Sequence, residues 1–246
     1  MRIGAIRPLA DSAVTLEMAT IVGLEASANV AAALGAIEQA MASGGLSGVS
    51  EVAAAFCSVT VHYDCLQIAQ SDLADRLTRL LDGVAATARP EGRSWLLPCC
   101  YNPELGLDLA SLSETLSLDP DRIVAVHHAT TFHVYALGFL PGLPFLGDLP
   151  QDLARPRRTE PRLRVPAGSV AIANRMCVIY PWNSPGGWHI VGRCPVPLFD
   201  ITCDVPALLA AGDNIQFRPI TLEEFRDLDR DLHADGSNRD AFRVAS

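Results

Sequence analysis

The sequence predicts an α+β protein with a small N-terminal α/β sandwich-like domain followed by a β-barrel domain. Helix and strand patterns alternate over residues 1–92, and short apolar strands broken by Pro and Gly dominate residues 93–222. Residues 223–246 are a polar C-terminal tail rich in Asp, Glu and Arg, in which we expect a short helix that fades into a flexible end. A chain of 246 residues is long enough for two domains that each bury a core.

Two periodicities predict the elements of the N-terminal domain. Apolar and polar residues alternate over 14–18 and 57–63, which is the period of a half-buried strand. Apolar residues three and four apart over 30–41 predict one face of a helix that ends at Gly44. A second helix with a stripe of leucines is expected to follow, with Ser71 as its N-cap.

The segment 86–93 contains Pro and Gly and is predicted to be the boundary between the domains. Beyond it we expect a strand over 94–101 and a short helix over 109–116. Asp119 directly before Pro120 marks the start of another helix, with the aspartate as its cap. From residue 131 onward, the apolar strands broken by Pro and Gly are typical of a closed barrel.

Composition excludes several classes of site. The chain contains no lysine, which excludes a Schiff-base lysine, a GxxxxGK phosphate loop and a lysine general base. A net charge of −9 without a long basic face argues against nucleic-acid binding. No apolar run approaches the roughly 18 residues of a membrane helix, and a signal-peptide pattern is missing, so we expect a cytoplasmic protein without membrane association.

Cysteine usage fits a reducing compartment. The count is seven, without a CxxC pair, which argues against a disulfide framework and against a structural zinc site. No metal site is predicted elsewhere in the chain. Five of the cysteines are predicted to be small core residues: Cys57, Cys99, Cys100, Cys177 and Cys203.

A local basic cluster stands out in this acidic chain. Five arginines fall between Arg155 and Arg164. The planar fork of arginine binds carboxylate and phosphate groups in a bidentate manner, so the cluster is a candidate anion site, with a solvated loop as the alternative. Arg162 and Arg164 alternate with apolar residues on an apparent strand and are therefore expected to share one face.

His189 follows two glycines and a tryptophan in the segment GGWHIVGR. Glycines let a ligand approach the backbone closely, and a histidine there can act as a general acid or base; the alternative is a histidine that pins the turn. Arg193 follows four residues later, on the same side of a regular strand. We predict that Arg162, Arg164, Arg193 and His189 line one anion-binding pocket.

Other polar residues are less indicative of chemistry. Ser169 and Ser184 lie outside any GxSxG motif and have no triad partners at a recognisable spacing, so Ser169 is expected to donate a hydrogen bond near a ligand or cap a turn. His127, His128 and His133 cluster near a helix end without metal-ligand spacing. Packing and capping are their predicted roles.

Several long segments resemble the signature blocks of the KipI-like family: GFLPGLPFLGDL, PRLRVPAGSVAIA and IYPWNSPGGWHIVGRCPVPLFD. The match is specific over residues 130–220 and colinear upstream. The family includes the B subunit of the bacterial ATP-dependent 5-oxoprolinase, proteins labelled allophanate hydrolase subunit 1, and an inhibitor of a sporulation histidine kinase. The resemblance implies that the barrel is cyclophilin-like.

The resemblance also implies a function. It suggests the B subunit of a complex that uses ATP with magnesium as co-substrate to open the small molecule 5-oxoproline to glutamate, with no tightly bound cofactor. The partners would be a homologous cyclophilin-like C subunit, which is KipA-like, and an A subunit, and this chain would be inactive alone. The alternatives are a non-catalytic module that inhibits a histidine kinase and a component related to allophanate hydrolase or urea carboxylase.

Within these blocks the resemblance suggests His189 as a catalytic residue. Where relatives usually read AGxQTGIYP, however, this chain has Met176 in place of the glutamine and Cys177 and Val178 after it. Cys194 likewise stands where threonine is usual. The expected substrate-binding or nucleotide-binding residues are Arg158, Arg162, Arg164, Ser169, Gly186, Gly187 and Arg193.

Overall fold

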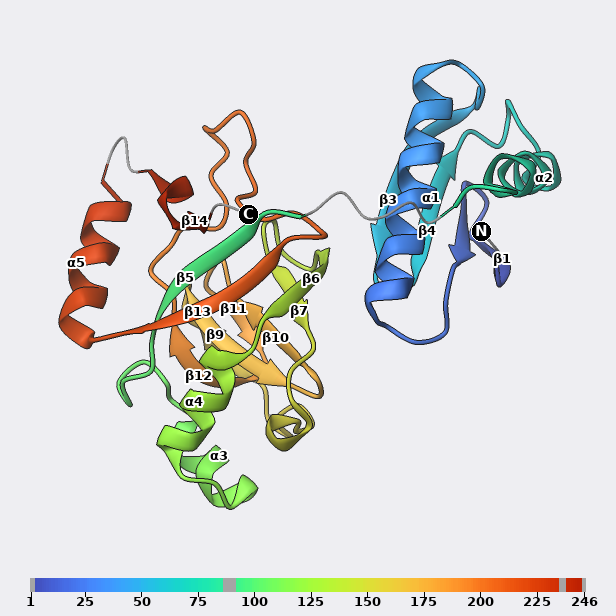
Figure 1. Cartoon of the computed structure of the whole chain (residues 1–246). Helices are drawn as coiled ribbons and strands as arrows, with labels where there is room; N and C mark the ends of the chain where they lie inside the picture. Colours follow the sequence, from blue (N-terminus) through green and yellow to red (C-terminus); the bar gives the residue numbers. More distant parts are fainter. Residues whose placement is uncertain (1–2, 86–91, 235–237, 245–246) are drawn as a thin grey trace. The chain divides into compact units, whose positions relative to one another are not determined.

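The structure, a computed structural model, describes residues 3–85, 92–234 and 238–244. The chain divides into two compact units, Met1–Pro90 and Glu91–Ser246 (Figure 1). Most of the segment 86–93, which we predict to be the domain boundary, lies outside the described residues. No helix in the described ranges combines the length and apolar character needed to cross a membrane.

The first unit is one antiparallel sheet with two helices. Its sheet has the order β1-β2-β4-β3, and its core gathers valines and leucines of the sheet with apolar residues of both helices. In Figure 1, α1 lies along the sheet beside β3 and β4, and it contacts both strands. The elements are β1 (Ala5–Leu9), β2 (Ala13–Glu17), α1 (Leu24–Ala42), β3 (Val49–Ala55), β4 (Ser58–Tyr63) and α2 (Gln70–Leu81).

The local signals of this unit are confirmed with one exception. Helix α1 ends before Gly44, whose φ of 77° lies in the left-handed region that favours glycine. Helix α2 begins at Gln70 with Ala69 at the cap position, so the prediction of Ser71 as the N-cap is wrong. Burial of Leu73, Leu77 and Leu81 decides where this helix packs, and a serine in its first turn does not define its start.

The second unit is built on a closed barrel, which confirms the predicted fold class. The strands follow one another in the order β12-β9-β10-β7-β6-β13-β5, and a further pairing of β12 with β5 closes the ring. Strands β13 and β5 pair in parallel, over the full length of both. The strands are β5 (Ser94–Cys100), β6 (Phe132–Leu137), β7 (Pro144–Gly147), β9 (Ser169–Ala173), β10 (Met176–Ile179), β12 (His189–Arg193) and β13 (Asn214–Ile220).

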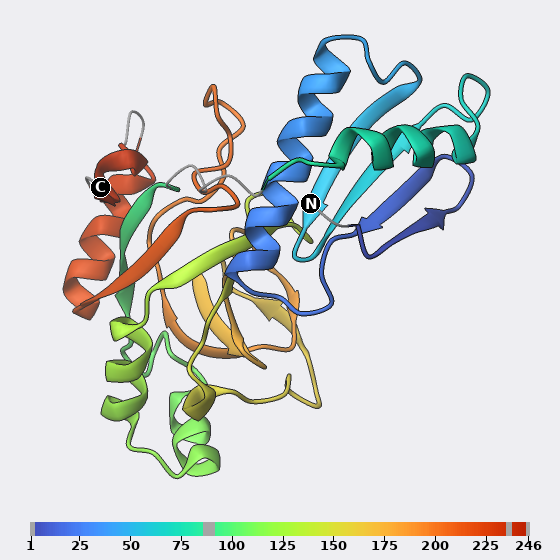
Figure 2. The same ribbon diagram turned by 45° about the vertical axis from the view of Figure 1, so that its right-hand side comes forward.

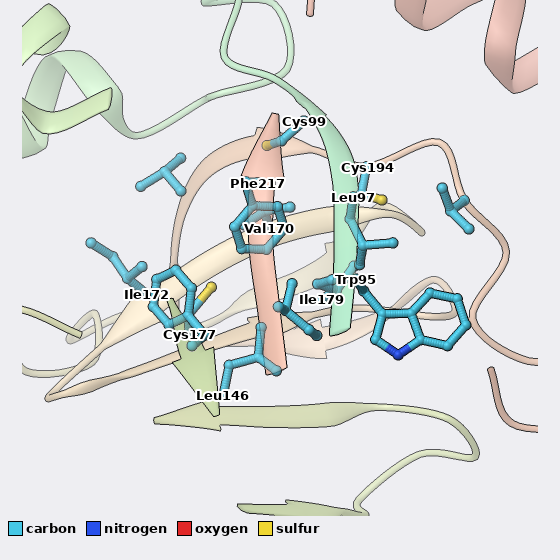
Figure 3. Close-up of a cluster of buried hydrophobic side chains, with 14 of the residues drawn as sticks. Trp95, Leu97, Cys99, Leu146, Val170, Ile172, Cys177, Ile179, Cys194 and Phe217 are labelled. Carbon is cyan, nitrogen blue, oxygen red and sulfur yellow. The ribbon is translucent and has the colours of Figure 1, made fainter. Parts of the chain in front are cut away.

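Apolar side chains from all around the ring fill the barrel (Figure 3). Trp95, Phe132 and Phe217 are among the largest of them and are almost completely buried. Cys99, Cys100, Cys177 and Cys194 are buried as well. Cys57 and Cys203, however, are only half-buried, so their predicted core position is wrong.

Two helices and a short sheet accompany the barrel. Helix α3 (Leu109–Leu116) has the predicted bounds, and α4 (Pro120–Ala129) begins after Asp119, whose carboxylate accepts from the Asp121 N–H at 2.8 Å. Strands β8 (Arg162–Val165) and β11 (Ser184–Gly186) pair with each other in a separate small sheet. A 3₁₀ turn (η1, Gln151–Leu153) precedes the arginine-rich segment.

His127 on α4 is completely buried inside the barrel unit. It makes a hydrogen bond of 2.8 Å between its Nδ1 and the Tyr101 hydroxyl, and its Nε2 lies 3.5 Å from the Cys177 sulfur. Burial lowers the pKa of His127 to about 3, since a charged imidazole would be desolvated there. The predicted packing role of this histidine is confirmed.

The C-terminal segment begins with a helix, as the sequence predicts, and further elements follow it. Helix α5 (Leu222–Leu232) lies beside β5 and β13 (Figure 2), and its Phe225 and Leu232 are buried. After it come a 3₁₀ turn (η2, Arg239–Phe242) and β14 (Arg243–Val244), which pairs with β5. Buried Arg239 donates to the carbonyl oxygens of Pro206 and Val205 at 3.0 and 3.1 Å.

Candidate functional site

The arginine-rich segment and the segment around His189 lie side by side. The Arg158 N–H donates to the Gly187 carbonyl at 2.7 Å, and strands β8 and β11 continue this contact. Nε2 of His189 lies 2.9 Å from the Pro156 carbonyl oxygen. The structure therefore brings Arg158, Arg162, Gly186, Gly187 and His189 together.

Asp108 connects the arginine-rich segment to the strand that contains His189. This residue precedes α3 and is only 2% exposed. Its Oδ1 accepts from Nη1 of Arg158 at 2.9 Å and Nη2 of Arg162 at 2.7 Å. Its Oδ2 accepts from Nη1 of Arg162 at 2.9 Å and from the Ile190 N–H at 2.7 Å. Two guanidinium groups on one carboxylate leave the cluster with a net positive charge.

Asp108 is not among the predicted site residues, because no local pattern connects it with arginines that follow 50 and 54 residues later. Its side chain does not cap α3. It instead fixes the guanidinium groups of Arg158 and Arg162, which are 30% and 23% exposed. The guanidinium groups that we predicted to bind a ligand thus already donate hydrogen bonds to Asp108. Both arginines act mainly as fixed positive charges at the surface.

A cationic hollow opens above this cluster. It has a volume of about 390 Å³, and its lining includes Arg155, Arg157, Arg158, Thr159 and His189. Nη2 of Arg155 donates to the Thr115 carbonyl at 2.7 Å, while its buried Nε makes no hydrogen bond with the described residues.

The contact of His189 fixes its tautomer. A carbonyl oxygen can only accept, so Nε2 of His189 must carry the hydrogen that is donated to Pro156. In the neutral imidazole, Nδ1 therefore keeps its lone pair as the acceptor. The histidine can thus receive a proton or a hydrogen bond at Nδ1 without losing the contact that holds it.

An aromatic hollow adjoins the cationic one and shares Arg157 with it. Its volume is about 140 Å³, and its lining includes Phe145, Tyr180, Gly186 and Trp188. The guanidinium carbon of Arg157 lies 5.6 Å from the centre of the Trp188 ring, in cation–π geometry. Burial raises the pKa of Tyr180, and the nearby charge of Arg157 partly opposes that rise.

Arg193 lines a third hollow, of about 350 Å³. Its Nε donates to the Ala167 carbonyl at 2.7 Å, and its guanidinium carbon lies 6.0 Å from the Phe225 ring centre. Burial lowers the pKa of Arg193, an effect that Asp229 in the same hollow opposes. The segment around Cys194 lines this hollow, whereas His189 lines the cationic hollow.

The structure therefore corrects the prediction that Arg162, Arg164, Arg193 and His189 line a single pocket, because Arg193 and His189 line different hollows. The register of β12 against β9 shifts between Ile190 and Gly192, which marks a bulge. An extra residue moves the following side chains to the other face, so a spacing of four no longer places His189 and Arg193 together. Arg164 is exposed on β8 and lines none of the three hollows.

The remaining expected site residues have backbone roles. Ser169 is 2% exposed, and its carbonyl accepts from the Tyr180 N–H at 2.9 Å, which positions that tyrosine. The Gly187 carbonyl accepts the hydrogen bond from the Arg158 N–H that is described above. Within residues 3–85, 92–234 and 238–244, no group of three His, Cys, Asp or Glu side chains is arranged to hold a metal ion.

Comparison with protein families relates the chain to one of them. Residues 4–209 match the family described as carboxyltransferase domain, subdomain C and D. The B subunit of the Bacillus subtilis 5-oxoprolinase is 32% identical over 234 residues, which cover 89% of this chain and 94% of that protein. The B subunit of the Escherichia coli O157:H7 5-oxoprolinase is 41% identical over 148 residues, or 60% of this chain and 67% of that protein.

Solved structures agree with the fold. The crystal structure of TTHA0988 superposes with a TM-score of 0.71 at 32% identity over 85% of this chain, which spans only 40% of that protein. The urea amidolyase of Kluyveromyces lactis superposes with a TM-score of 0.74 over 92% of this chain and 15% of the amidolyase. At 20% identity, that likeness concerns the fold alone.

Proposed function

The chain belongs to the family of the carboxyltransferase domain, subdomain C and D, and from that premise we propose that it is the B subunit of an ATP-dependent 5-oxoprolinase. The observation that carries the proposal is the similarity to the B subunit of the Bacillus subtilis 5-oxoprolinase, which continues through 94% of that protein. Such coverage means that both units of this chain have counterparts there. In the reaction, water opens the lactam of 5-oxoproline to glutamate while ATP is hydrolysed to ADP and phosphate.

The geometry of the cationic hollow supports this proposal. Its volume of about 390 Å³ lies within the roughly 300–1,000 Å³ of small-molecule sites. Arg155, Arg157 and Arg158 place positive charge around it, which suits phosphate or carboxylate oxygens. Since the chain has no lysine, these arginines carry the charge that a nucleotide requires. Magnesium would arrive with the nucleotide, because Mg²⁺ in such sites is held largely by phosphates and water.

His189 is the residue in this hollow that can move a proton. Its Nε2–H is engaged by Pro156, so Nδ1 is the atom that can accept a proton from an attacking water or from an intermediate. The neighbouring guanidinium groups stabilise negative charge that develops on an oxygen. The hollow thus offers a base and an electrostatic stabiliser.

The proposal includes partner proteins. A homologous cyclophilin-like C subunit and an A subunit would complete the catalytic complex. The cationic hollow contains a base and positive charges but lacks a lysine phosphate anchor and a metal-binding carboxylate group among its named lining residues. We therefore expect the purified chain alone to have little activity.

The experiment is co-expression of this chain with homologues of the A and C subunits from its own genome. We expect the three proteins to co-purify and to hydrolyse ATP only when 5-oxoproline is added, with glutamate as the product. His189→Gln in the complex should lower turnover about a hundredfold, the usual contribution of a positioned base. Arg175→Gln, which changes an exposed arginine outside the three hollows, serves as the control and should leave turnover unchanged.

Two outcomes would reject the proposal. One is a complex that consumes urea or allophanate and ignores 5-oxoproline, which would favour the function class of the urea amidolyase relative. The other is robust 5-oxoproline-dependent ATP hydrolysis by this chain alone, which would remove the need for partners.

A further inference from the structure

The hydroxyl group of Tyr180 is the starting point. Tyr180 is 3% exposed, and both its N–H and its carbonyl are bonded to the backbone of β9 and the turn before it. Its hydroxyl makes no hydrogen bond with any residue that the structure describes. The only fully buried side-chain nitrogen or oxygen atom without a partner among the described residues is Nε of Arg155, so the Tyr180 oxygen is reached from outside and is not sealed in the core. Tyr180 lines the aromatic hollow, so its hydroxyl is a hydrogen-bonding group that a molecule in this hollow can use.

Gly186 packs directly against the end of the Tyr180 side chain. A Cβ atom at this position would lie 2.4 Å from the Tyr180 hydroxyl oxygen, closer than any van der Waals contact. The φ of Gly186 is outside the left-handed region, so its backbone conformation does not require glycine. The absence of a side chain is therefore explained by the position of Tyr180, which a Cβ atom at residue 186 would displace from the hollow.

The size of the hollow limits what can bind. Its volume of about 140 Å³ is close to that of an engineered cavity of about 150 Å³ that holds benzene. One ring of five or six atoms fits, whereas a nucleotide does not. Leu143, Phe145, Val178 and Trp188 give this space apolar walls, which suit the methylene groups of a saturated ring.

The charge at the hollow selects for a carboxylate. Arg157 is exposed, lies over the Trp188 ring and forms no hydrogen bond with the described residues, in contrast to Arg158. Its whole fork is thus available for a bidentate contact. Phe139, which lies at the same hollow, has a φ of 66°, a strained value for a bulky residue of the kind that concentrates at ligand sites.

We propose that the aromatic hollow binds a small cyclic amide that carries a carboxylate, with the amide oxygen on the Tyr180 hydroxyl and the carboxylate on Arg157. Because burial raises the pKa of Tyr180, the phenol keeps its proton and can donate a hydrogen bond to the amide oxygen. A hydrogen bond to that oxygen makes the amide carbon more electrophilic. Tyr180 is therefore a substrate-binding residue that also polarises the amide.

The identity of 5-oxoproline as the member of this class rests on the proposed function. It is a five-membered lactam with one carboxylate, so the ring, the amide oxygen and the charge each have a counterpart in the hollow. Arg157 lies on the border between the aromatic and cationic hollows, which places the lactam next to His189 and the arginines.

The test measures binding to the purified full-length chain by calorimetry or ligand-observed NMR. Three probes separate the contacts: 5-oxoproline, cyclopentanecarboxylate without the amide, and 2-pyrrolidinone without the carboxylate. We expect the parent to bind 5-oxoproline about five- to tenfold more tightly than cyclopentanecarboxylate, through the amide hydrogen bond. Tyr180→Phe should abolish this preference, and Gly186→Ala should block all three probes.

Arg157→Gln should weaken both carboxylate probes about tenfold to a hundredfold and leave 2-pyrrolidinone unchanged. Arg175→Gln is the matched control, which should bind like the parent. The melting temperature of each variant is measured in parallel, so that a folding defect is recognised. Tyr180→Phe removes one unbonded oxygen and is expected to fold normally, which keeps the test decisive even if Gly186→Ala destabilises the chain.

The proposal is overturned if the parent binds none of the probes, or if Tyr180→Phe keeps the preference for 5-oxoproline over cyclopentanecarboxylate. Its failure is distinguishable from failure of the proposed function. If 5-oxoproline binds in the Tyr180-dependent manner but the complex does not couple it to ATP hydrolysis, the site stands and the enzyme assignment falls. If the complex turns over and Tyr180→Phe and Arg157→Gln have the parent's KM and kcat for 5-oxoproline, the enzyme assignment stands and this site falls.

Discussion

Two buried tyrosines of the barrel unit, Tyr101 and Tyr180, differ in what their hydroxyl groups meet. The Tyr101 hydroxyl forms a hydrogen bond of 2.8 Å with His127, which in turn contacts Cys177 in the barrel core. The Tyr180 hydroxyl has no partner within the described residues and lines the aromatic hollow. Both side chains are at most 9% exposed, so burial alone does not distinguish them.

The difference separates a structural polar group from a binding one. A buried polar group that is fully paired stabilises the fold, and its removal leaves an unsatisfied partner. A polar group on the wall of a hollow that has no protein partner contributes little to folding, because water can reach it, and it is available to a ligand. Asp108 belongs to the first kind, since both of its oxygens are bonded to arginines or to the backbone. The comparison can be tested by removing groups of each kind.

The largest effect is expected for Asp108→Ala. The substitution leaves the guanidinium groups of Arg158 and Arg162 without their carboxylate, and removing one member of a buried ion pair typically costs about 3–5 kcal/mol. Urea denaturation should give that loss in the free energy of unfolding. Asp152→Ala changes an exposed aspartate of η1 and should shift it by less than about 0.5 kcal/mol. If the two variants were equally stable, Asp108 would not be a polar group that stabilises the fold.

The second effect is a pH dependence that arises from His127. Its pKa is about 3 in the folded chain and about 6.5 when unfolded, so below pH 6.5 only the unfolded state binds this proton. Stability is therefore fully present above pH 6.5 and is lost as the pH falls toward 3. By pH 4 the loss should reach about 3 kcal/mol.

The measurement for His127 is the free energy of unfolding between pH 7 and pH 4. His127→Gln should be less stable at pH 7, because Tyr101 loses its partner, but its stability should fall less steeply with pH. His233→Gln, which removes an exposed histidine, should keep the slope of the parent. A parent slope retained in His127→Gln would assign the acid sensitivity to other groups.

The smallest effects on stability are expected for Tyr101→Phe and Tyr180→Phe, which compare the two tyrosines directly. Tyr101→Phe leaves Nδ1 of His127 without its hydrogen bond and should cost about 1–2 kcal/mol of stability. Tyr180→Phe removes an oxygen without a described partner and should change stability by less than about 0.5 kcal/mol. Thermal unfolding of both variants checks the contrast. A larger loss for Tyr180→Phe would mean that its hydroxyl supports the fold.

Local sequence signals predicted much of the fold. Asp119 before Pro120 located the start of α4, and α3 has the predicted bounds, because capping and helical periodicity depend on neighbouring residues. The strand pattern around Val59 and Val61 likewise corresponds to β4. Ser71 was misread because serine is favoured at an N-cap in general, whereas the start of α2 follows from the burial of its leucines.

The candidate site was predictable only in part. The arginine cluster and His189 are visible as residue types in turn-rich segments, and the structure brings several of them together. The separation of Arg193 from His189 was not visible, because the bulge in β12 depends on its pairing with β9. Tyr180 and Trp188 look like ordinary core aromatics in the sequence.

The sequence by itself determined the α+β class, the order of the elements, the absence of lysine chemistry and the family resemblance, because these depend on composition and on short-range patterns. Only the tertiary structure decided which polar groups are paired. Asp108 meets Arg158 and Arg162 across 50 and 54 residues of chain, and Tyr180 is left without a partner while Tyr101 has one. Pairing across such distances is set by strand register and barrel closure, which no local pattern encodes.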